Sequence, residues 1–391
     1  MHIGIVTQRF ITGDGQGYIN YSVAQAALDR GHSLILIGLE IDPSLRDHPN
    51  VTWVPIAVPA LPTQLLRDQA FAWRSRREID ALRDTLDLLL VNGAITWSRS
   101  DINAIHFVHD AWRRSPARED DARSGLHNWY HALYTAVNTA WERWTLRRTQ
   151  HVVAVSSLVK AQVEALDLDV PISVIPNGID PTQFSPEGPA VDRTEIGCPL
   201  DAPLGLFVGD IRTSLKNLDT VLRALRAVPS LHLAVAGSLE GSPFPTLAVE
   251  LGVEDRVHFL DFRRDIPALM RTADLLVFPS RYETFSLVVL EAMASGLPVI
   301  TARTVGAADC LTPESGIVLD DPNDEEALVG ALRMLVANPN RRREMGRAAR
   351  LVAEDYHIRT TAERYVDLFE TLEPEPSSSP SHATAVSTVS P

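Results

Sequence analysis

The sequence predicts an α/β protein with two doubly wound, Rossmann-like parallel sheets. The chain has 391 residues, which is more than one hydrophobic core comfortably supports, so two domains are expected. Short apolar runs alternate with amphipathic stretches in both halves, a pattern typical of βα units. The segment 174–189 between the halves is rich in Pro, Gly and Asn, residues that break regular elements, and marks the predicted boundary.

The first half begins with a strand, a glycine loop and a helix. The strand is "HIGIVT", the loop is "GDGQGY", and the helix "YSVAQAALDR" is expected to end at Gly31. Further buried strands are predicted at "SLILIG", "DLLLVNG", "AIHFVHD" and "HVVAVSS". Open α/β sheets bind ligands at the carboxyl ends of their strands, so the polar residues after these runs are site candidates.

The second half repeats this alternation. One amphipathic helix is predicted at "NLDTVLRALRAV", and another at "SLVVLEAMASG", with Ser286 as its N-cap and Gly296 as its end. Strands are expected at "PLGLFVGD", "LHLAVAGS", "RVHFLD", "DLLVFPS" and "LPVITA". After a terminal helix near residue 372, the Ser/Pro-rich segment 374–391 is expected to be disordered.

Two glutamates bracket the start of the second of these helices. Glu283 precedes it and Glu291 lies inside it, with seven residues between them. The backbone amides of Phe285, Ser286 and Leu287 form a helix start, which favours phosphate. A carboxylate on each side of an anion site suits a nucleotide sugar. The alternative is that Glu283 caps a turn and Glu291 lies on a solvated helix face.

The stretch "PSRYETFSLVVLEAMASGLPVITARTVGAAD" resembles the signature region of the retaining family-4 glycosyltransferases, the glycosyl transferases group 1. "VIPNGID", "FVGDIRTSLKNLDTVLRAL", "FVHD" and "GDGQGY" resemble further motifs of that family, in the family's order. The resemblance implies the GT-B fold, in which two Rossmann-like domains face each other across a cleft. Residues 1–178 would bind the acceptor, residues 186–354 would bind the donor, and helix 355–372 would pack back on the first domain.

The same resemblance assigns roles on the donor side. Glu283 would bind hydroxyls of the donor sugar, and Glu291 would bind the ribose. Lys216 would pair with the diphosphate. The family's usual arginine directly follows the strand glycine, but Asp210 follows Gly209 here, so Arg212 is predicted as the substitute. Lysine occurs only twice in the chain, at positions 160 and 216, although a solubilising charge remains the alternative for Lys216.

On the acceptor side, the resemblance places His109 near the transferred carbon of the sugar. A structural histidine at a strand end is the alternative, and the neighbouring Asp110 would orient the imidazole or cap the next helix. Gly15 and Gly17 would let the backbone approach the diphosphate or the acceptor, with a plain tight turn as the alternative.

The resemblance implies an enzyme, a hexosyltransferase-type glycosyltransferase. It would move a sugar from a nucleotide-diphosphate sugar to a hydroxyl of a glycan, lipid-linked or small-molecule acceptor, with retention of configuration. It would need neither a metal nor another cofactor. Two alternatives stay open: a non-catalytic nucleotide-sugar-binding or scaffold protein, and another GT-B enzyme such as an epimerase. The nucleotide base, the sugar and the acceptor are not evident from the sequence.

The composition of the chain restricts its possible binding partners and its cellular location. The net charge of −14 argues against nucleic acid binding. Cys198 and Cys310 fit neither a metal motif nor a disulfide framework, so a reducing cytoplasm is expected. No stretch approaches the ~20 apolar residues of a membrane span. Tryptophans and arginines interleave over residues 112–148, which suggests either peripheral contact with the inner membrane face or a helix packed on the sheet.

Overall fold

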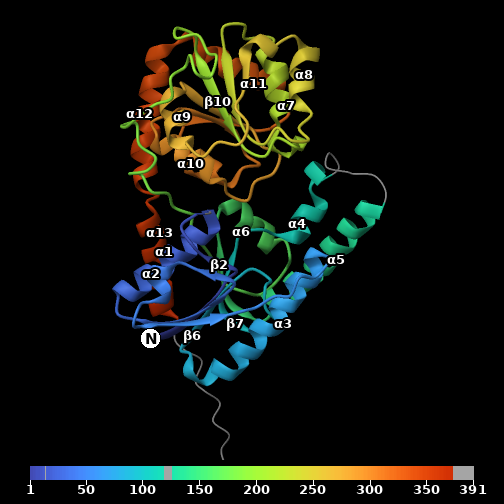
Figure 1. Ribbon diagram of the computed structural model, residues 1–391, viewed down its shortest axis with the longest axis vertical. Helices are drawn as coiled ribbons and strands as arrows, with labels where there is room; N and C mark the ends of the chain where they lie inside the picture. The colour runs from blue at the N-terminus through green and yellow to red at the C-terminus, as the bar shows by residue number, and fades with distance from the viewer. Residues whose placement is uncertain (14, 119–125, 373–391) are drawn as a thin grey trace, which may run out of the picture.

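The structure is a computed structural model that describes residues 1–13, 15–118 and 126–372. The predicted disordered segment 374–391 lies outside the described residues. Within them the predicted α/β class is confirmed. Two parallel sheets, each covered by helices, form two lobes that lie one above the other in Figure 1.

The first lobe is built on a seven-stranded sheet with the order β5-β3-β1-β6-β7-β8-β9, in which neighbouring strands are parallel. The order runs in opposite directions on the two sides of β1, which makes the sheet doubly wound. Its strands are β1 His2–Val6, β3 Ser33–Gly38, β5 Val51–Pro55, β6 Leu88–Asn92, β7 Ser100–Ile105, β8 Thr149–Ala154 and β9 Ile172–Val174. A separate short pair joins β2 Arg9–Phe10 to β4 Glu40–Ile41.

The strands of this sheet are apolar, and helices pack on both faces of the sheet and bury them. These helices are α1 Gly15–Asp29, α2 Pro43–Arg46, α3 Gln64–Leu82, α4 His109–Arg114, α5 Leu126–Leu146 and α6 Ser157–Glu164, with 3-10 turns at Arg83–Thr85 and Pro116–Arg118.

The second lobe contains a six-stranded parallel sheet with the order β12-β11-β10-β13-β14-β15. Its strands are β10 Leu204–Val208, β11 His232–Ala236, β12 Val257–Phe259, β13 Leu275–Phe278, β14 Val299–Ala302 and β15 Gly316–Leu319. Its helices are α7 Leu218–Leu225, α8 Phe244–Leu251, α9 Ile266–Thr272, α10 Leu287–Ala294, α11 Glu325–Ala337 and α12 Pro339–Glu354, with 3-10 turns at Ser214–Lys216, Glu254–Arg256 and Gly306–Cys310.

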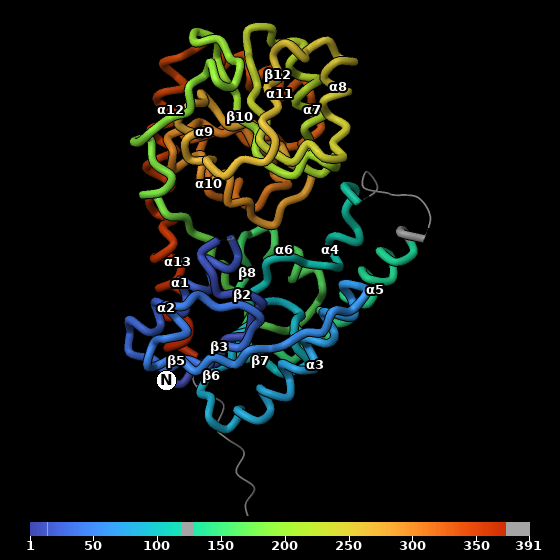
Figure 2. The backbone as a smooth tube through the Cα atoms, in the orientation of Figure 1, coloured from blue at the N-terminus to red at the C-terminus, as the bar shows by residue number. Residues whose placement is uncertain are grey.

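The last helix, α13 Ile358–Thr371, packs against α1 of the first lobe. Figure 2 shows the chain running from α12 in the second lobe down one side of the molecule to α13. Tyr365 and Phe369 are buried in the same core as α1. Arg30, just after α1, pairs with Asp367 at 2.7 Å. The terminal helix therefore links the two lobes by a second route besides the segment after β9.

Strand β7 lies earlier in the chain than predicted, at Ser100–Ile105, and the motif "FVHD" follows it as a loop and the start of α4. The start of this strand was not predicted, because it contains polar residues, which in the structure are buried and hydrogen-bonded. Asp101 accepts the N–H of Leu89 (2.7 Å), and Asn103 accepts the N–H of Gly93 (2.8 Å). Burial of satisfied polar groups costs little, so a polar strand remains stable inside a sheet.

Other differences concern edges and the glycine loop. Strands β5, β9 and β15 were not predicted. All three lie at sheet edges and are only partly buried, so their apolar patterns are weaker. Helix α1 begins at Gly15, so Gly15 and Gly17 of the predicted loop belong to its first turn. The predicted ends of helices at Gly31 and Gly296 are confirmed, with φ of 82° and 77°.

Candidate active site

The centre of the candidate site is an ion pair between Lys216 and Glu283. Lys216 ends the 3-10 turn that follows β10, and Glu283 lies in the loop that follows β13. Both side chains are largely buried, with exposed fractions of 20% and 18%. Since β10 and β13 are adjacent and parallel, their carboxyl ends deliver both residues to the same edge of the sheet.

Hydrogen bonds tie the loop after β13 to the turn after β10. The carbonyl of Leu215 accepts bonds from the backbone N–H of Arg281 (2.9 Å) and the hydroxyl of Ser280 (3.1 Å). The guanidinium of Arg281 pairs with Asp219 in the first turn of α7 (2.8 Å). The backbone on both sides of the ion pair is therefore held in one position.

Asn217 fixes the same junction from inside the lobe. Its backbone is left-handed, with φ of 67°, and it ends the turn and precedes α7. Its buried side-chain amide donates to the carbonyls of Pro279 (2.9 Å) and Pro322 (2.6 Å). Asparagine meets both demands, because it tolerates the left-handed region and carries two N–H donors.

Lys216 remains able to bind an anion near neutral pH. Burial lowers the pKa of Lys216 to about 8, and the charge of Asp210 opposes that shift. The carboxylate of Glu283 favours the ammonium form in the same way. The stem of Lys216 packs beside Gly209, where a β-carbon would lie 3.4 Å from its Cγ, an ordinary van der Waals distance.

Arg212, the predicted companion of Lys216, already has a carboxylate partner. Its guanidinium donates two hydrogen bonds to Asp210, of 2.8 and 2.7 Å. More than half of its side chain is exposed, at 55%. Lys216 and Arg212 both lower the pKa of Asp210, so the three charges form one group after β10. Contact between Arg212 and a diphosphate would replace its bond to Asp210, and this role stays a prediction.

Helix α10 begins beside this group, and Ser286 does not cap it as predicted. Ser286 has φ of 85° and ψ of 95°, and its side chain makes no capping bond. N-cap bonding needs an extended backbone, which this residue lacks. Phe285 is buried at 3% exposure, and its carbonyl accepts the N–H of Ala307 (2.8 Å). The amides of the first turn of α10 have no acceptor within the helix, as at any helix start.

Glu291 lies four residues beyond Leu287, roughly 6 Å along the helix at ~1.5 Å per residue. It keeps part of its surface exposed, yet the protein surrounds it closely enough that burial raises its pKa to about 7. A carboxyl group in such a place is costly to ionise and is ready to accept bonds from a ligand.

In the first lobe, the start of α4 carries the predicted residues His109 and Asp110. The carboxylate of Glu142, from α5, accepts the backbone N–H groups of His109 (2.9 Å) and Asp110 (3.3 Å). Asp110 therefore does not cap α4. Its own buried carboxylate pairs with Arg114 (2.6 Å) in the next turn. Burial lowers the pKa of His109 to about 4, so its imidazole is neutral at pH 7.

Aromatic contacts place His109 beside the loop of the second lobe that carries Glu283. The ring of Tyr282 lies 5.9 Å from that of Phe107 and 5.1 Å from that of Trp112. Phe107 in turn lies 5.0 Å from the imidazole of His109. The predicted histidine therefore lies close to the loop of the second lobe that carries the predicted glutamate, at the place where the two lobes meet.

Close backbone approaches also join the lobes. A β-carbon at Gly15 would lie 2.6 Å from the side chain of Leu287, at the start of α10. At Gly306 it would lie 2.1 Å from the carbonyl oxygen of Thr284. That carbonyl accepts the hydroxyl of Ser156 (2.7 Å), which follows β8. Loops after strands of both sheets therefore meet at the cleft.

A cavity of about 520 Å³ lies on the first-lobe side. Its lining includes Gly17 and His109, which were predicted, and Asp68, Tyr134, Asn138 and Glu142, which were not. The last three recur at a spacing of four residues on α5. Their regular spacing, which places polar side chains on one face of the helix, is the signal that would have identified them.

Helix α5 is mostly a packed element rather than an exposed amphipathic one. Trp141 is 3% exposed and stacks on Trp97 at 5.0 Å. Trp144 also contacts Trp97, at 5.1 Å. Trp129 is 69% exposed. Trp141 and Trp144 therefore pack inside the first lobe, against the segment after β6, and peripheral contact with a membrane stays a prediction. No helix among the described residues is long and apolar enough to cross a membrane.

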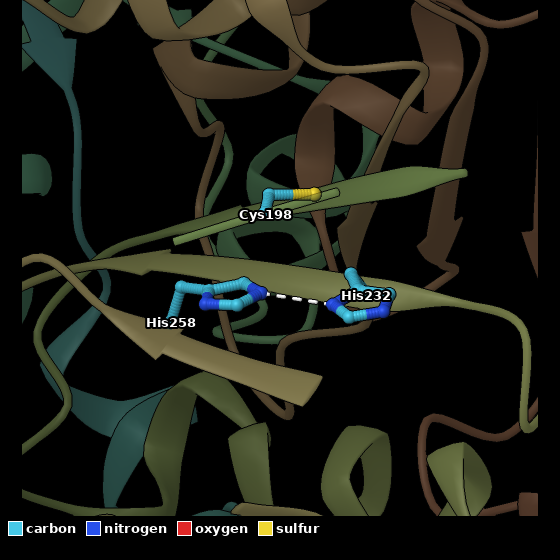
Figure 3. Close-up of side chains that lie close together, drawn as sticks. All are labelled: Cys198, His232 and His258. Atoms are coloured by element: carbon cyan, nitrogen blue, oxygen red, sulfur yellow. Dashed lines mark hydrogen bonds between the residues drawn. The ribbon is translucent and has the colours of Figure 1, made fainter. Parts of the chain in front are cut away.

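Among the described residues, one group has a spacing suited to a metal ion: Cys198, His232 and His258, shown in Figure 3. The two imidazoles hydrogen-bond to each other at 2.9 Å. His232 is the first residue of β11, so the group lies at the amino ends of the strands. The cleft lies at their carboxyl ends. No sequence motif indicates this group, because its members come from three separate segments.

Comparison with known proteins agrees with this architecture. Residues 13–183 match the family described as "Glycosyltransferase Family 4", and residues 191–352 match "Glycosyl transferases group 1". The D-inositol 3-phosphate glycosyltransferase of Saccharomonospora viridis is 30% identical over 305 residues, which cover 71% of this chain and 68% of the relative. Matches to two further relatives of that name cover 52% and 48% of the relatives' length, so the chain spans about half of them.

Solved structures share the fold over nearly the whole chain. Sucrose-phosphate synthase from Thermosynechococcus elongatus has a TM-score of 0.76 at 20% identity, covering 94% of this chain and 98% of its own. Anabaena HepE, solved with UDP-glucose, has a TM-score of 0.69 at 17% identity, covering 95% and 100%. The chain belongs to the family-4 glycosyltransferases, has the GT-B fold and is a glycosyltransferase.

Proposed function

We propose that this glycosyltransferase moves a sugar from a nucleoside diphosphate sugar to a hydroxyl group of an acceptor, with retention of the anomeric configuration. The observation that carries the proposal is the Lys216–Glu283 ion pair, set at the edge of the second sheet opposite His109. The ion pair places a cation that could bind phosphate next to a carboxylate that could bind sugar hydroxyls, and the surrounding hydrogen bonds hold both in position.

The donor would bind along the start of α10. Its diphosphate would take the ammonium of Lys216 from Glu283 and meet the first amides of the helix. Glu283, released from the lysine, would accept hydrogen bonds from the sugar hydroxyls. Glu291, roughly 6 Å further along the helix, would accept those of the ribose. Arg212 would add a second cation if the diphosphate displaces Asp210.

In the reaction step, the bond between the anomeric carbon and the phosphate oxygen breaks, and the nucleoside diphosphate leaves with the electron pair. The acceptor oxygen forms its bond to the same face of that carbon, and its proton passes to the departing phosphate. The protein contributes charge stabilisation, since Lys216 and the α10 amides face the charge that develops on the leaving group. No side chain has to become covalently attached.

His109 would contact the donor sugar as a neutral imidazole. Its low pKa lets it donate and accept hydrogen bonds without adding charge beside the anomeric carbon, where positive charge develops. The carboxylate of Glu142 holds the start of α4, and with it His109, by accepting the first two backbone N–H groups of that helix. The closed lobe contacts would exclude water and so limit hydrolysis of the donor.

The comparisons support the substrate classes without fixing them. Structural neighbours were solved with UDP and glucose or with UDP-glucose, which favours a nucleotide sugar donor. The relatives' name contains D-inositol 3-phosphate, which favours a polyol acceptor. The base and the sugar transferred are left to experiment.

We also propose that the reaction needs no metal or organic cofactor, because Lys216, Arg212 and the α10 amides supply positive charge at the diphosphate. The Cys/His group lies at the opposite end of the sheet and takes no part. Peripheral contact with a membrane from a cytoplasmic location is a further expectation, on which the transfer step does not depend.

The first prediction concerns Lys216. Replacing it by glutamine is expected to lower kcat for nucleotide release by ~10²–10³, because one donor to the leaving group is lost. The assay measures release of UDP, GDP or ADP from the corresponding glucose donors, with mixed polyol acceptors and with water alone. Lys160→Gln is the matched control, since Lys160 pairs with Glu164 on α6 at 3.8 Å. Equal rates for the two variants would contradict the proposal.

The second prediction concerns pH. Because ionised Glu291 is the better acceptor of ribose hydroxyls, nucleotide affinity should rise between pH 6 and pH 7.5, through its pKa of about 7. Glu291→Gln should bind more weakly and lose this rise. Calorimetric titration with UDP, GDP and ADP measures both. A wild-type profile that is flat, or that falls over this range, would rule out this role.

The third prediction concerns the same carboxyl group and the stability of the folded protein. Nucleotide affinity should rise with pH, whereas stability should fall. The folded-state pKa of this group, about 7, lies above the ordinary value of 4.5, so the folded protein loses stability as pH rises between them. Glu291→Gln removes that loss. Its Tm should exceed the wild-type Tm at pH 7.5 and match it at pH 4.5, which differential scanning fluorimetry can test.

The fourth prediction concerns the approach of the lobes at Gly15. Gly15→Val is expected to raise KM for the donor several-fold, because its side chain would push Leu287 away from the cleft. Gly13→Val is the control, since a β-carbon there meets nothing within 4 Å. Indistinguishable KM values would show that this approach does not matter for donor binding.

A further inference from the structure

The first-lobe cavity has a wall of hydrogen-bonding amides. Asn20 comes from α1, Asn92 ends β6 and Asn138 belongs to α5. Asn92 donates to Asn20 (2.8 Å), and Asn20 donates to the hydroxyl of Thr7 (2.9 Å). Amide groups both donate and accept, which suits the hydroxyls of a polyol. The volume of about 520 Å³ lies within the ~300–1,000 Å³ typical of small-molecule sites.

One further polar group that lines the cavity could bind a hydroxyl of a ligand. The Nε2 atom of His106, which lines the cavity, is buried and has no hydrogen-bond partner within the described part of the chain. Burial lowers the pKa of His106 to about 4, so the ring is neutral at pH 7. A hydroxyl can satisfy this atom whichever tautomer the ring adopts.

The fixed charges of the cavity are mostly negative. Asp68 accepts bonds from Gln64 (2.7 Å) and Tyr134 (3.2 Å), and burial raises its pKa. Glu142 contributes the second carboxylate, whose pKa burial raises to about 7. Burial raises the pKa of both groups, and it outweighs the lowering effect of Arg67 on Asp68 and of Arg143 on Glu142.

Positive charge is scarce there. Among the described lining residues, Arg9 is the one cationic side chain. Its guanidinium pairs with Glu40 at 3.5 Å, and 56% of the side chain is exposed to solvent. A phosphate group is normally bound by several cations or by a helix start. This cavity offers one arginine that is already paired, together with two carboxylates and several neutral amides. The first turn of α1, with Gln16 and Gly17, is a helix start that also lines it.

We propose that the acceptor is a polyol without a phosphate group, and that an ammonium substituent is favoured over a neutral hydroxyl at the same position. The inference rests on the proposed function, because it takes this cavity as the acceptor site. An ammonium group would pair with Asp68 or Glu142, whereas a phosphate would bring negative charge against both. Hydroxyls of the same molecule would bind the amide network and His106.

The test uses three probes that differ at one carbon: 6-amino-6-deoxyglucose, glucose and glucose 6-phosphate. Their Kd values are measured on the full chain saturated with UDP at pH 7, by ligand-observed NMR. The expected order is tightest for the amine and weakest for the phosphate, with about tenfold or more between those two. Tighter or equal binding of the phosphate, or no binding of the amine, would overturn the proposal.

A pair of variants on α3 assigns the effect to the cavity. Asp68→Asn is expected to reduce the amine-to-phosphate preference by about tenfold, because a charge-assisted bond is lost. Asp80→Asn, on the exposed face of the same helix, should keep the wild-type preference. An unchanged preference in Asp68→Asn would overturn the assignment.

Failure of this inference differs from failure of the proposed function. If the chain binds no nucleoside diphosphate and releases none from any sugar donor, the proposed function fails. If it does both, yet prefers the phosphorylated probe, only the acceptor class is wrong.

Discussion

The buried ion pair between Lys216 and Glu283 is the interaction on which the rest of the site depends. Two charges that leave water need close contact and firm support, or the cost of desolvation exceeds their attraction. Asn217 and the Arg281–Asp219 pair give that support by fixing the turn after β10 to the loop after β13. The pair therefore holds a phosphate-binding cation and a hydroxyl-binding carboxylate in place before any donor arrives.

The same geometry explains why two lobes are needed. Each parallel sheet sends polar loops from the carboxyl ends of its strands, and the two sets meet where Gly306 and Ser156 lie against Thr284. The second lobe supplies charge for a diphosphate. The first lobe supplies the neutral His109 and an amide-rich cavity. Ionisable groups are poorly solvated on both walls, and the raised pKa values of Glu142 and Glu291 show the energetic cost of that arrangement.

Sequence patterns predicted what depends on local chemistry. Apolar runs predicted most strands, and the resemblance predicted both lobes and the candidates Lys216, Glu283 and His109. The structure pairs Lys216 with Glu283 and places His109 near the loop that carries Glu283. Contacts between distant segments were not predictable: the bonds from Glu142 to the start of α4 and the group of Cys198, His232 and His258 arise only after folding. The missed start of β7 has the same origin, since its polar residues are satisfied by neighbouring strands.

The scarcity of lysine allows the most direct measurement of the central claim, that Lys216 is the cation that binds the donor diphosphate. In protein labelled with ¹³C at lysine Cε, only Lys160 and Lys216 give signals, and Lys216→Gln assigns them. Adding UDP, GDP or ADP should raise the titration midpoint of the Lys216 signal above its starting pKa of about 8 and leave the Lys160 signal unchanged. If saturating nucleotide binds and the Lys216 titration does not move, the account of the site is wrong.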